Sequence, residues 1–307
     1  MTDTPDPAQP GSPMPLGGYQ VPYLPPVRPA PPPGDPLTGP PDESFGGWFQ
    51  RAWGFVRRSW LPAGLISLGA VVLPSVLLAV PLGLLVHRLG GLSGDPSPAQ
   101  LASLRRDVVV LALVTIGPVL LLMYLQSAAL VANLRLMARD TVGAARDLPA
   151  DLRYGLRRGA VLALWQLLEV PVVLIGFLCC LVPGYYLQLA LSQVPPAVAF
   201  EPGRHALPRS FRLMHRDFWP SVGRMLITSM IAGTAASMVS VAAEVPLVVA
   251  APFVDPALLV AVFTPFAVVL AAPTAVLQCA GTLATYTGLR AKEPDPPTGA
   301  RLVASAE

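Results

Sequence analysis

Charged residues are scarce in this chain, and lysine is almost missing. Only 13% of its 307 residues are Asp, Glu, Lys or Arg, whereas a soluble domain carries about 25%. Lys292 is the single lysine, so the remaining 20 basic side chains are arginines. No soluble stretch gathers enough basic and aromatic residues for a nucleic-acid-binding domain. The composition therefore excludes an ordinary soluble globular protein and a nucleic-acid partner.

Cysteine and histidine are equally sparse. The three cysteines, Cys179, Cys180 and Cys279, provide no disulfide framework, and the three histidines do not pair with them at ligand spacing. The sequence also contains no glycine-rich phosphate loop and no Ser/His/Asp arrangement. We therefore predict a protein without a metal, a cofactor or a catalytic site.

Long uncharged runs dominate what is present. Hydrophobic residues make up 53% of the chain, and the mean hydropathy is +0.57. A hydrocarbon core of about 30 Å is crossed by ~20 apolar residues in a helix. Runs of that kind lie at 61–86, 108–134, 159–182, 183–200, 221–250 and 258–289. The sequence thus predicts an all-α, polytopic transmembrane helical bundle of about six spans.

The fourth of these runs is the least regular. Pro183 and Gly184 separate it from the third run, which predicts a tight helical hairpin with its turn at this dipeptide. Pro195 and Pro196 interrupt the helix near its other end. Whether this run crosses the membrane completely is left open by the sequence.

The two ends of the chain differ from the middle. Residues 1–41 contain 15 prolines, a composition that favours extended, solvated backbone. We predict a disordered Pro-rich cytoplasmic tail at 1–44, a six-helix membrane domain at 45–290 and a disordered cytoplasmic tail at 291–307. The Pro-rich tail is either a plain spacer or a docking segment for a protein partner.

Arginine placement predicts the orientation of the spans. Basic residues concentrate in cytoplasmic connections, and in an N-inside arrangement only Arg88, Arg105 and Arg106 of the 21 basic residues face outward. Both termini are therefore predicted to be cytoplasmic. The preference for arginine over lysine, with abundant Ala, Gly and Pro, is typical of a high-GC bacterial genome, so we predict a multi-pass protein of the bacterial plasma membrane.

Two segments that precede long runs resemble one another. RAWGFVRRSWLP at 51–62 and RSFRLMHRDFWP at 209–220 align without a gap. At 100° per residue, the arginines of the first copy fall opposite Trp53, Phe55 and Trp60, which predicts an interfacial amphipathic helix. Such helices place rings at headgroup depth and guanidinium groups on anionic phosphates. The candidate headgroup-binding residues are Arg51, Arg57, Arg58, Arg209, Arg212 and Arg216.

A third short segment, LPADLRYGLRR at 148–158, also predicts a helix along the cytoplasmic surface. Pro149 and Asp151 suit its first turn, and Leu148, Leu152 and Leu156 recur every four residues. The default interpretation is a solvated elbow, and the alternative is a docking site for a partner.

The region 183–220 resembles the signature P-G-x-Y…P-P…E…A-L-x-R-S-[WF]-x-L…F-W of the glycerophosphoryl diester phosphodiesterase membrane-domain family and of related uncharacterised bacterial membrane proteins. The matching positions are Pro183, Gly184, Tyr186, Pro195, Pro196, Glu201, Ala206, Leu207, Arg209, Ser210, Phe211, Leu213, Phe218 and Trp219. A weaker resemblance extends over about 45–292. It implies a membrane module. The family's soluble catalytic barrel has no counterpart in this sequence, so the resemblance is not taken to imply phosphodiesterase activity.

Two carboxylates fall inside apolar runs. Glu169 lies near the middle of 159–182, where an ionised carboxylate costs at least ~2.5 kcal/mol, and Glu244 lies toward the outer part of 221–250. Either is a functional candidate or an interhelical hydrogen-bond partner. In the same fifth run, Ser229, Gly233 and Ser237 form a flat small-residue face, which predicts close helix packing within the chain or a homo-oligomer.

These features support one main hypothesis and two alternatives. The main hypothesis is a noncatalytic membrane scaffold or membrane-organising module that engages anionic inner-leaflet lipids and a partner. The first alternative is a transporter or channel for a small solute or ion that uses Glu169 near the membrane midplane. An intramembrane enzyme is the second, although the sequence pairs no nucleophile with a base.

Overall fold

The computed structural model describes residues 35–90, 98–201, 203, 205–250 and 256–306, all within one unit that covers residues 31–307. Every regular element in these ranges is a helix. The helices are α1 (Phe45–Gly90), α2 (Pro98–Thr141), α3 (Leu148–Cys179), α4 (Leu181–Leu191), α5 (Val194–Phe200), α6 (Ala206–Arg216), α7 (Phe218–Ala250), α8 (Pro256–Ala291) and α9 (Gly299–Ala304). The all-α prediction is confirmed over these residues.

Four helical segments in the described ranges are long and apolar enough to cross a membrane. They are Phe45–Leu78, Leu104–Thr141, Leu148–Cys179 and Phe218–Ala242. This supports the predicted membrane protein. The predicted number of spans, six, remains a prediction.

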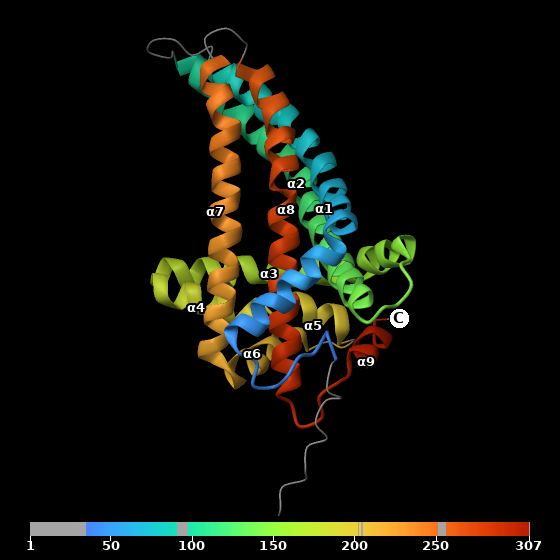
Figure 1. Ribbon diagram of the computed structural model, residues 1–307. Helices are drawn as coiled ribbons and strands as arrows, with labels where there is room; N and C mark the ends of the chain where they lie inside the picture. The colour runs from blue at the N-terminus through green and yellow to red at the C-terminus, as the bar shows by residue number, and fades with distance from the viewer. Residues whose placement is uncertain (1–34, 91–97, 202, 204, 251–255, 307) are drawn as a thin grey trace, which may run out of the picture. The chain divides into compact units, whose positions relative to one another are not determined.

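Two directions of helix organise this unit (Figure 1). The helices α1, α2, α7 and α8 run alongside one another, with α1 packed on both α2 and α8 and with α7 packed on α8. The helices α3 and α4 run across them, and α5, α6 and α9 gather near one end of the long helices. The predicted spans 159–182 and 183–200 therefore do not lie parallel to the other four.

The α3–α4 pair is a tight hairpin, as predicted, but its turn is at Cys180 rather than at Pro183-Gly184. Cys180 is extended, with φ −171° and ψ 152°, whereas Pro183 and Gly184 lie inside α4. Gly176 and Gly184 let the two helices approach, since a Cβ at Gly184 would overlap the ring of Phe177. α4 has 11 residues, or about 16 Å at 1.5 Å per residue. It is therefore too short to cross a bilayer, and the predicted helix 183–200 is in fact α4 and α5.

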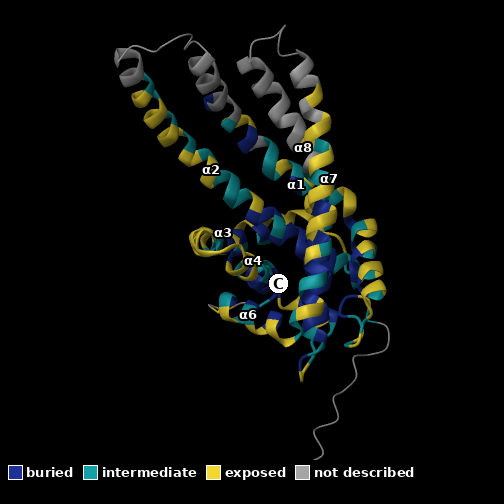
Figure 2. Cartoon of the chain, turned by 90° about the vertical axis from the view of Figure 1, so that its left-hand side faces the viewer, coloured by how far each residue is buried: buried dark blue, intermediate teal, exposed yellow. Residues whose placement is uncertain are grey.

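The core lies where the long helices meet α5, α6 and α9. Trp48, Phe55, Leu134, Met137 and Tyr286 are all fully buried there. Figure 2 shows that burial is concentrated in this part, whereas the described parts of α2, α3 and α7 farther from it are largely exposed. The exposed side chains are predominantly Leu, Val and Ile, and an apolar surface of this extent marks a lipid-facing or partner-facing region.

The predicted disordered tail at 291–307 is corrected by the structure. Thr298 caps α9 by accepting a hydrogen bond from the backbone N–H of Arg301, and Leu302, Val303 and Ala306 are buried. The backbone N–H of Gly299 also donates to Asp35 over 2.6 Å. This segment is ordered because its few apolar residues find a place in the core, which composition alone does not indicate.

Candidate functional site

An ion-pair network closes the end of the unit where α5, α6 and α8 meet. Arg209 of α6 lies between two carboxylates, 2.7 Å from Glu201 and 2.8 Å from Glu293. Arg290 bridges the same two carboxylates, and the Tyr286 hydroxyl donates to Glu201 over 2.7 Å. Burial lowers the pKa of Arg209, but Glu201 and Glu293 more than offset it, so the net pKa is raised. The network therefore holds permanent charges that are already neutralised.

A second interior cation occupies the matching position of the first repeat copy. The side chain of Arg51 is 7% exposed and forms an ion pair with Glu43, which is also 7% exposed. Its guanidinium additionally donates to the carbonyl oxygens of Leu37 and Ala284, at 2.8 and 2.9 Å, and to the Thr287 hydroxyl at 2.7 Å. Arg51 thus joins the start of α1 to the end of α8.

Arg51 and Arg209 are paired with carboxylates in the same way. Arg51 pairs with Glu43 and Arg209 pairs with Glu201, so each arginine contacts a carboxylate eight residues earlier in the chain. The sequence analysis missed Glu43, although extending the gapless alignment upstream would have matched it with Glu201. Arg51 and Arg209 were predicted to bind lipid headgroups. The structure corrects this prediction, because both guanidinium groups are held inside by protein carboxylates.

The remaining candidate arginines face outward. Arg57, Arg58 and Arg212 are exposed, and no described residue pairs with their guanidinium groups. Arg216 is exposed as well, but its guanidinium lies 3.6 Å from Glu293. Exposed indole rings accompany them at Trp53, Trp60 and Trp219. We call these residues the arginine–tryptophan belt: Arg57, Arg58, Arg212, Trp53, Trp60 and Trp219.

Of the two carboxylates in the apolar runs, the structure describes only that of Glu169. Glu169 is half-exposed on α3, and no described residue forms an ion pair or hydrogen bond with it. Gln166, one turn before Glu169 on α3, accepts a hydrogen bond from the Ser127 hydroxyl of α2 at 2.6 Å. Glu244 belongs to α7, but its side chain lies outside the described residues. Glu169 does not line the groove that the structure forms between α1, α2 and α3.

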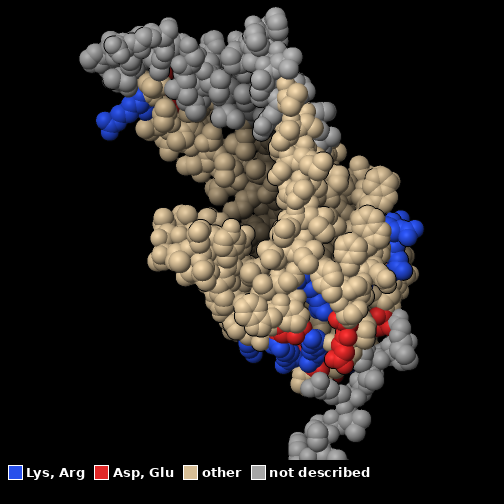
Figure 3. All heavy atoms as spheres, turned by 60° about the vertical axis from the view of Figure 1, so that its left-hand side comes forward, with Lys and Arg blue, Asp and Glu red and all other residues tan. Residues whose placement is uncertain are grey.

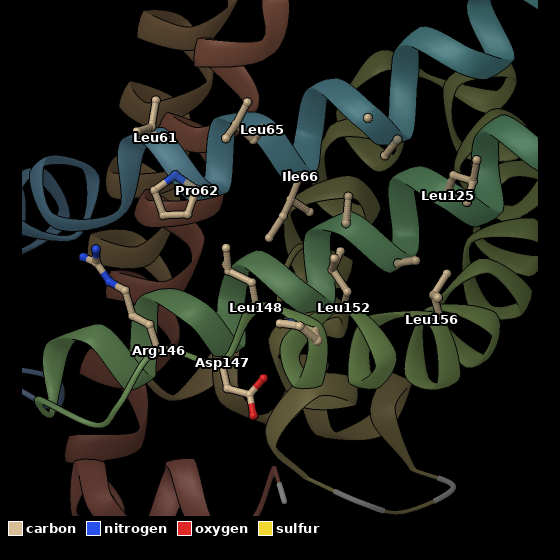
Figure 4. Close-up of a pocket in the computed structure, with 15 residues that line it drawn as sticks. Leu61, Pro62, Leu65, Ile66, Leu125, Arg146, Asp147, Leu148, Leu152 and Leu156 are labelled. Carbon is tan, nitrogen blue, oxygen red and sulfur yellow. The ribbon is translucent and has the colours of Figure 1, made fainter.

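That groove is an open cavity with a volume of about 810 Å³. Apolar side chains of α1 and α2 and the leucine stripe of α3 line most of it. Figure 4 shows Arg146 and Asp147 at one end and Leu125 and Leu156 at the other. The stripe predicted from the spacing of Leu148, Leu152 and Leu156 therefore lines an open groove, in which these leucines remain 38–44% exposed.

Within the described ranges, no three His, Cys, Asp or Glu residues lie close enough together to hold a metal ion. Tyr186 and His215 form a hydrogen bond of 2.7 Å, and the ring of His215 stacks on Phe218, so this histidine is part of the α4–α6 contact. Guanidinium groups and indole rings remain the outward-facing functional groups.

Comparison of the chain with protein-family models, with curated proteins and with solved structures found no match.

Proposed function

We propose that this protein is a noncatalytic membrane-organising module, anchored by its long helices and inserted into the inner leaflet through the α3–α4 hairpin. One observation carries the proposal: the hairpin runs across the long helices, and α3 exposes a broad apolar face while Leu162 and Ala163 on its other side are buried. Leu164, Leu168, Val170, Ile175 and Leu178 of α3 are 52–77% exposed. A helix that is apolar all round belongs in a protein core or in lipid.

The direction of the hairpin decides what it does in the bilayer. If α1, α2, α7 and α8 cross the membrane, a hairpin that runs across them lies roughly in the membrane plane. Apolar helices in that position displace lipid in one leaflet only, and binding of that kind is sensitive to curvature. Four crossing helices also keep both termini on one side, which we place in the cytoplasm because of the arginine distribution.

The charge distribution supports the same placement. Figure 3 shows most of the visible charged side chains toward the lower end of the described part, beneath a broad neutral surface. The arginine–tryptophan belt combines rings suited to the headgroup depth with cations suited to anionic phosphates. We assign the belt to the inner-leaflet headgroups. The predicted partner of the Pro-rich tail at 1–44 stays a prediction. Residues 1–34 of this tail lie outside the described ranges, whereas Leu37 and Thr38 are buried and Glu43 pairs with Arg51, so the end of the tail is ordered.

The hairpin can be tested by making its end polar. The variant Leu178→Asp/Val182→Asp places two charges at positions where the side chains are 77% and 73% exposed. The free-energy cost of each charge in hydrocarbon is about 2.5–3.5 kcal/mol. In liposomes of mixed size, we expect the parent protein to be enriched in the smallest vesicles and the variant to be evenly distributed. Single-vesicle fluorescence measures this enrichment.

The matched control keeps the same positions apolar, as Leu178→Ile/Val182→Leu, and should sort like the parent. If the parent protein itself shows no enrichment in small vesicles, or if the aspartate variant sorts as the parent does, the hairpin does not organise the membrane.

The belt makes a separate prediction. Neutralising Arg57, Arg58 and Arg212 together with glutamine should reduce phosphatidylglycerol retained after detergent extraction, because each basic contact near an anionic leaflet contributes about 1 kcal/mol. Native mass spectrometry counts the retained lipids. The control is Arg105→Gln/Arg106→Gln, which neutralises two exposed arginines at the opposite end of α2. Equal lipid loss in both variants would contradict the assignment of the belt to the inner leaflet.

A further inference from the structure

We infer that the groove between α1, α2 and α3 binds one acyl chain of a glycerophospholipid, with the lipid phosphate at Arg146. The inference rests on the proposed placement of this end of the protein in the inner leaflet. It adds a defined lipid site, distinct from the hairpin and from the belt.

The groove exists because small residues occupy its floor. Gly69 and Ala70 of α1 and Ala128 and Ala129 of α2 line it without filling it. A Cβ at Gly69 would meet no atom within 4 Å. Leucine side chains from all three helices form the remainder of the wall. A volume of about 810 Å³ falls within the roughly 300–1,000 Å³ of small-molecule sites.

The polar end of the groove favours a phosphate. Arg146 Nε donates to Asp140 at 2.8 Å and its Nη2 donates to the carbonyl oxygen of Arg58 at 2.9 Å. No described residue accepts a hydrogen bond from Nη1, and the side chain is 56% exposed. The guanidinium is thus fixed on one edge and available on the other. This is the arrangement that a charge-assisted bond to a phosphate needs.

The neighbouring carboxylates do not cancel this preference. Asp140 is already engaged by Arg146 and by the Ser59 hydroxyl, which donates over 2.6 Å. Asp147 accepts the backbone N–H of Ala150 as the cap of α3. Figure 4 shows the Asp147 side chain directed away from the groove, while Arg146 points toward the α1 side below Pro62. The exposed Arg57 and Arg58 add positive charge on the same stretch of α1.

The shape of the site selects a lipid over a protein segment. One end carries a cation and the other end is lined by Leu125 and Leu156, which is the polarity of a phospholipid. A helix or a second copy of the chain would need its own anionic group at one end of an apolar ridge. Lipid is also the solvent of the adjoining exposed faces of α1 and α2 in the proposed placement.

The test compares two glycines of α1. Gly69→Phe places a ring in the groove, whereas Gly64→Phe places the same ring at a position that also has nothing within 4 Å but does not line the groove. The probe is phosphatidylglycerol with a diazirine on its acyl chain, in nanodiscs, and adducts on Leu65, Leu125 and Leu152 are mapped by mass spectrometry. If the new ring excludes two or more acyl-chain methylenes from the groove, labelling of these leucines should fall about tenfold in Gly69→Phe. Labelling should be unchanged in Gly64→Phe.

The phosphate is tested with a second probe, a diacylglycerol with the same diazirine chain. The parent protein should label about fivefold more strongly with phosphatidylglycerol than with diacylglycerol, and Arg146→Gln should lose this preference. Arg153→Gln, an exposed arginine of α3 that does not line the groove, should keep it.

Equal labelling of the groove in Gly69→Phe and Gly64→Phe would overturn the inference, because it would mean contact with bulk lipid only. Cross-linking of the groove leucines to a second copy in place of the lipid would overturn it as well. Vesicle sorting by the hairpin should be normal in Gly69→Phe, so failure of the groove and failure of the proposed function give different results.

Discussion

Replacing Arg51 with methionine lowers the free energy of unfolding by about 3–5 kcal/mol, the usual cost of removing one partner of a buried ion pair. The substitution leaves the Glu43 carboxylate, 7% exposed, without its cation. It also leaves the carbonyl oxygens of Leu37 and Ala284 and the Thr287 hydroxyl without the donor they now have. Because these groups belong to the start of α1 and the end of α8, the two helices should separate early. Thermal unfolding in a mild detergent measures the loss.

The controls use a second arginine and a second substitution. Arg57→Met removes an exposed arginine of the same helix, and its effect should stay within about 0.5 kcal/mol. Removing both charges, as Glu43→Met/Arg51→Met, should recover much of the stability, because a buried pair replaced by apolar groups is often nearly neutral. Equal losses for Arg51→Met and Arg57→Met would show that Arg51 is not an interior ion-pair partner.

The sequence predicted the helices well because hydropathy reports contact with lipid. The runs at 61–86, 108–134 and 221–250 all lie within single long helices. Hydropathy does not report direction, however. The run at 159–182 belongs to a helix as apolar as the other candidate spans, yet this helix, α3, forms a hairpin with α4 across the long helices. A residue in lipid has the same composition signal whether its helix crosses the bilayer or lies within it.

The arginines were harder to predict because their partners are distant in sequence. A helical projection of 51–62 separates Arg51 from the aromatic residues, but in the structure Trp53 and Trp60 are exposed and Arg51 is interior. Contacts with α8, more than 230 residues away, decide this. Repetition was the useful signal, since the same carboxylate spacing occurs in both copies.

The sequence also did not show which small residues form close contacts between helices. The face predicted for close packing, Ser229, Gly233 and Ser237 of α7, is exposed, and a Cβ at Gly233 would meet nothing within 4 Å. Its other predicted role, in a homo-oligomer, stays a prediction. The close contact within the chain instead joins Gly155 and Gly159 of α3 to Ala128 and Ala132 of α2. Gly155 lies beside charged residues in the segment 148–158, which was predicted to be a solvated elbow, and Gly159 begins the predicted span 159–182.

This contact leads to the second large expected effect. Gly159→Ala should destabilise the protein by about 1–3 kcal/mol, the range for forcing atoms into a packed contact. The new Cβ would overlap Cα of Ala128 and lie 2.6 Å from its backbone nitrogen. Backbone atoms cannot rotate out of the way as a side chain can, so α3 has to move away from α2. Gly155→Ala meets the Ala128 carbonyl oxygen at 2.5 Å and should act in the same direction.

Gly233→Ala is the matched control, because it places the same methyl group in open space on another long helix. There the substitution should raise stability by up to about 1 kcal/mol, since alanine has the higher helix propensity. Opposite shifts in the unfolding temperature are therefore expected from one chemical change. Leu152 and Leu156 lie on the same helix as Gly159 and form one wall of the groove, so Gly159→Ala should also reduce groove labelling by the diazirine lipid. If both glycine variants shift the unfolding temperature alike, α3 does not pack on α2 at Gly159, and the hairpin that α3 begins loses the contact that directs it across the long helices.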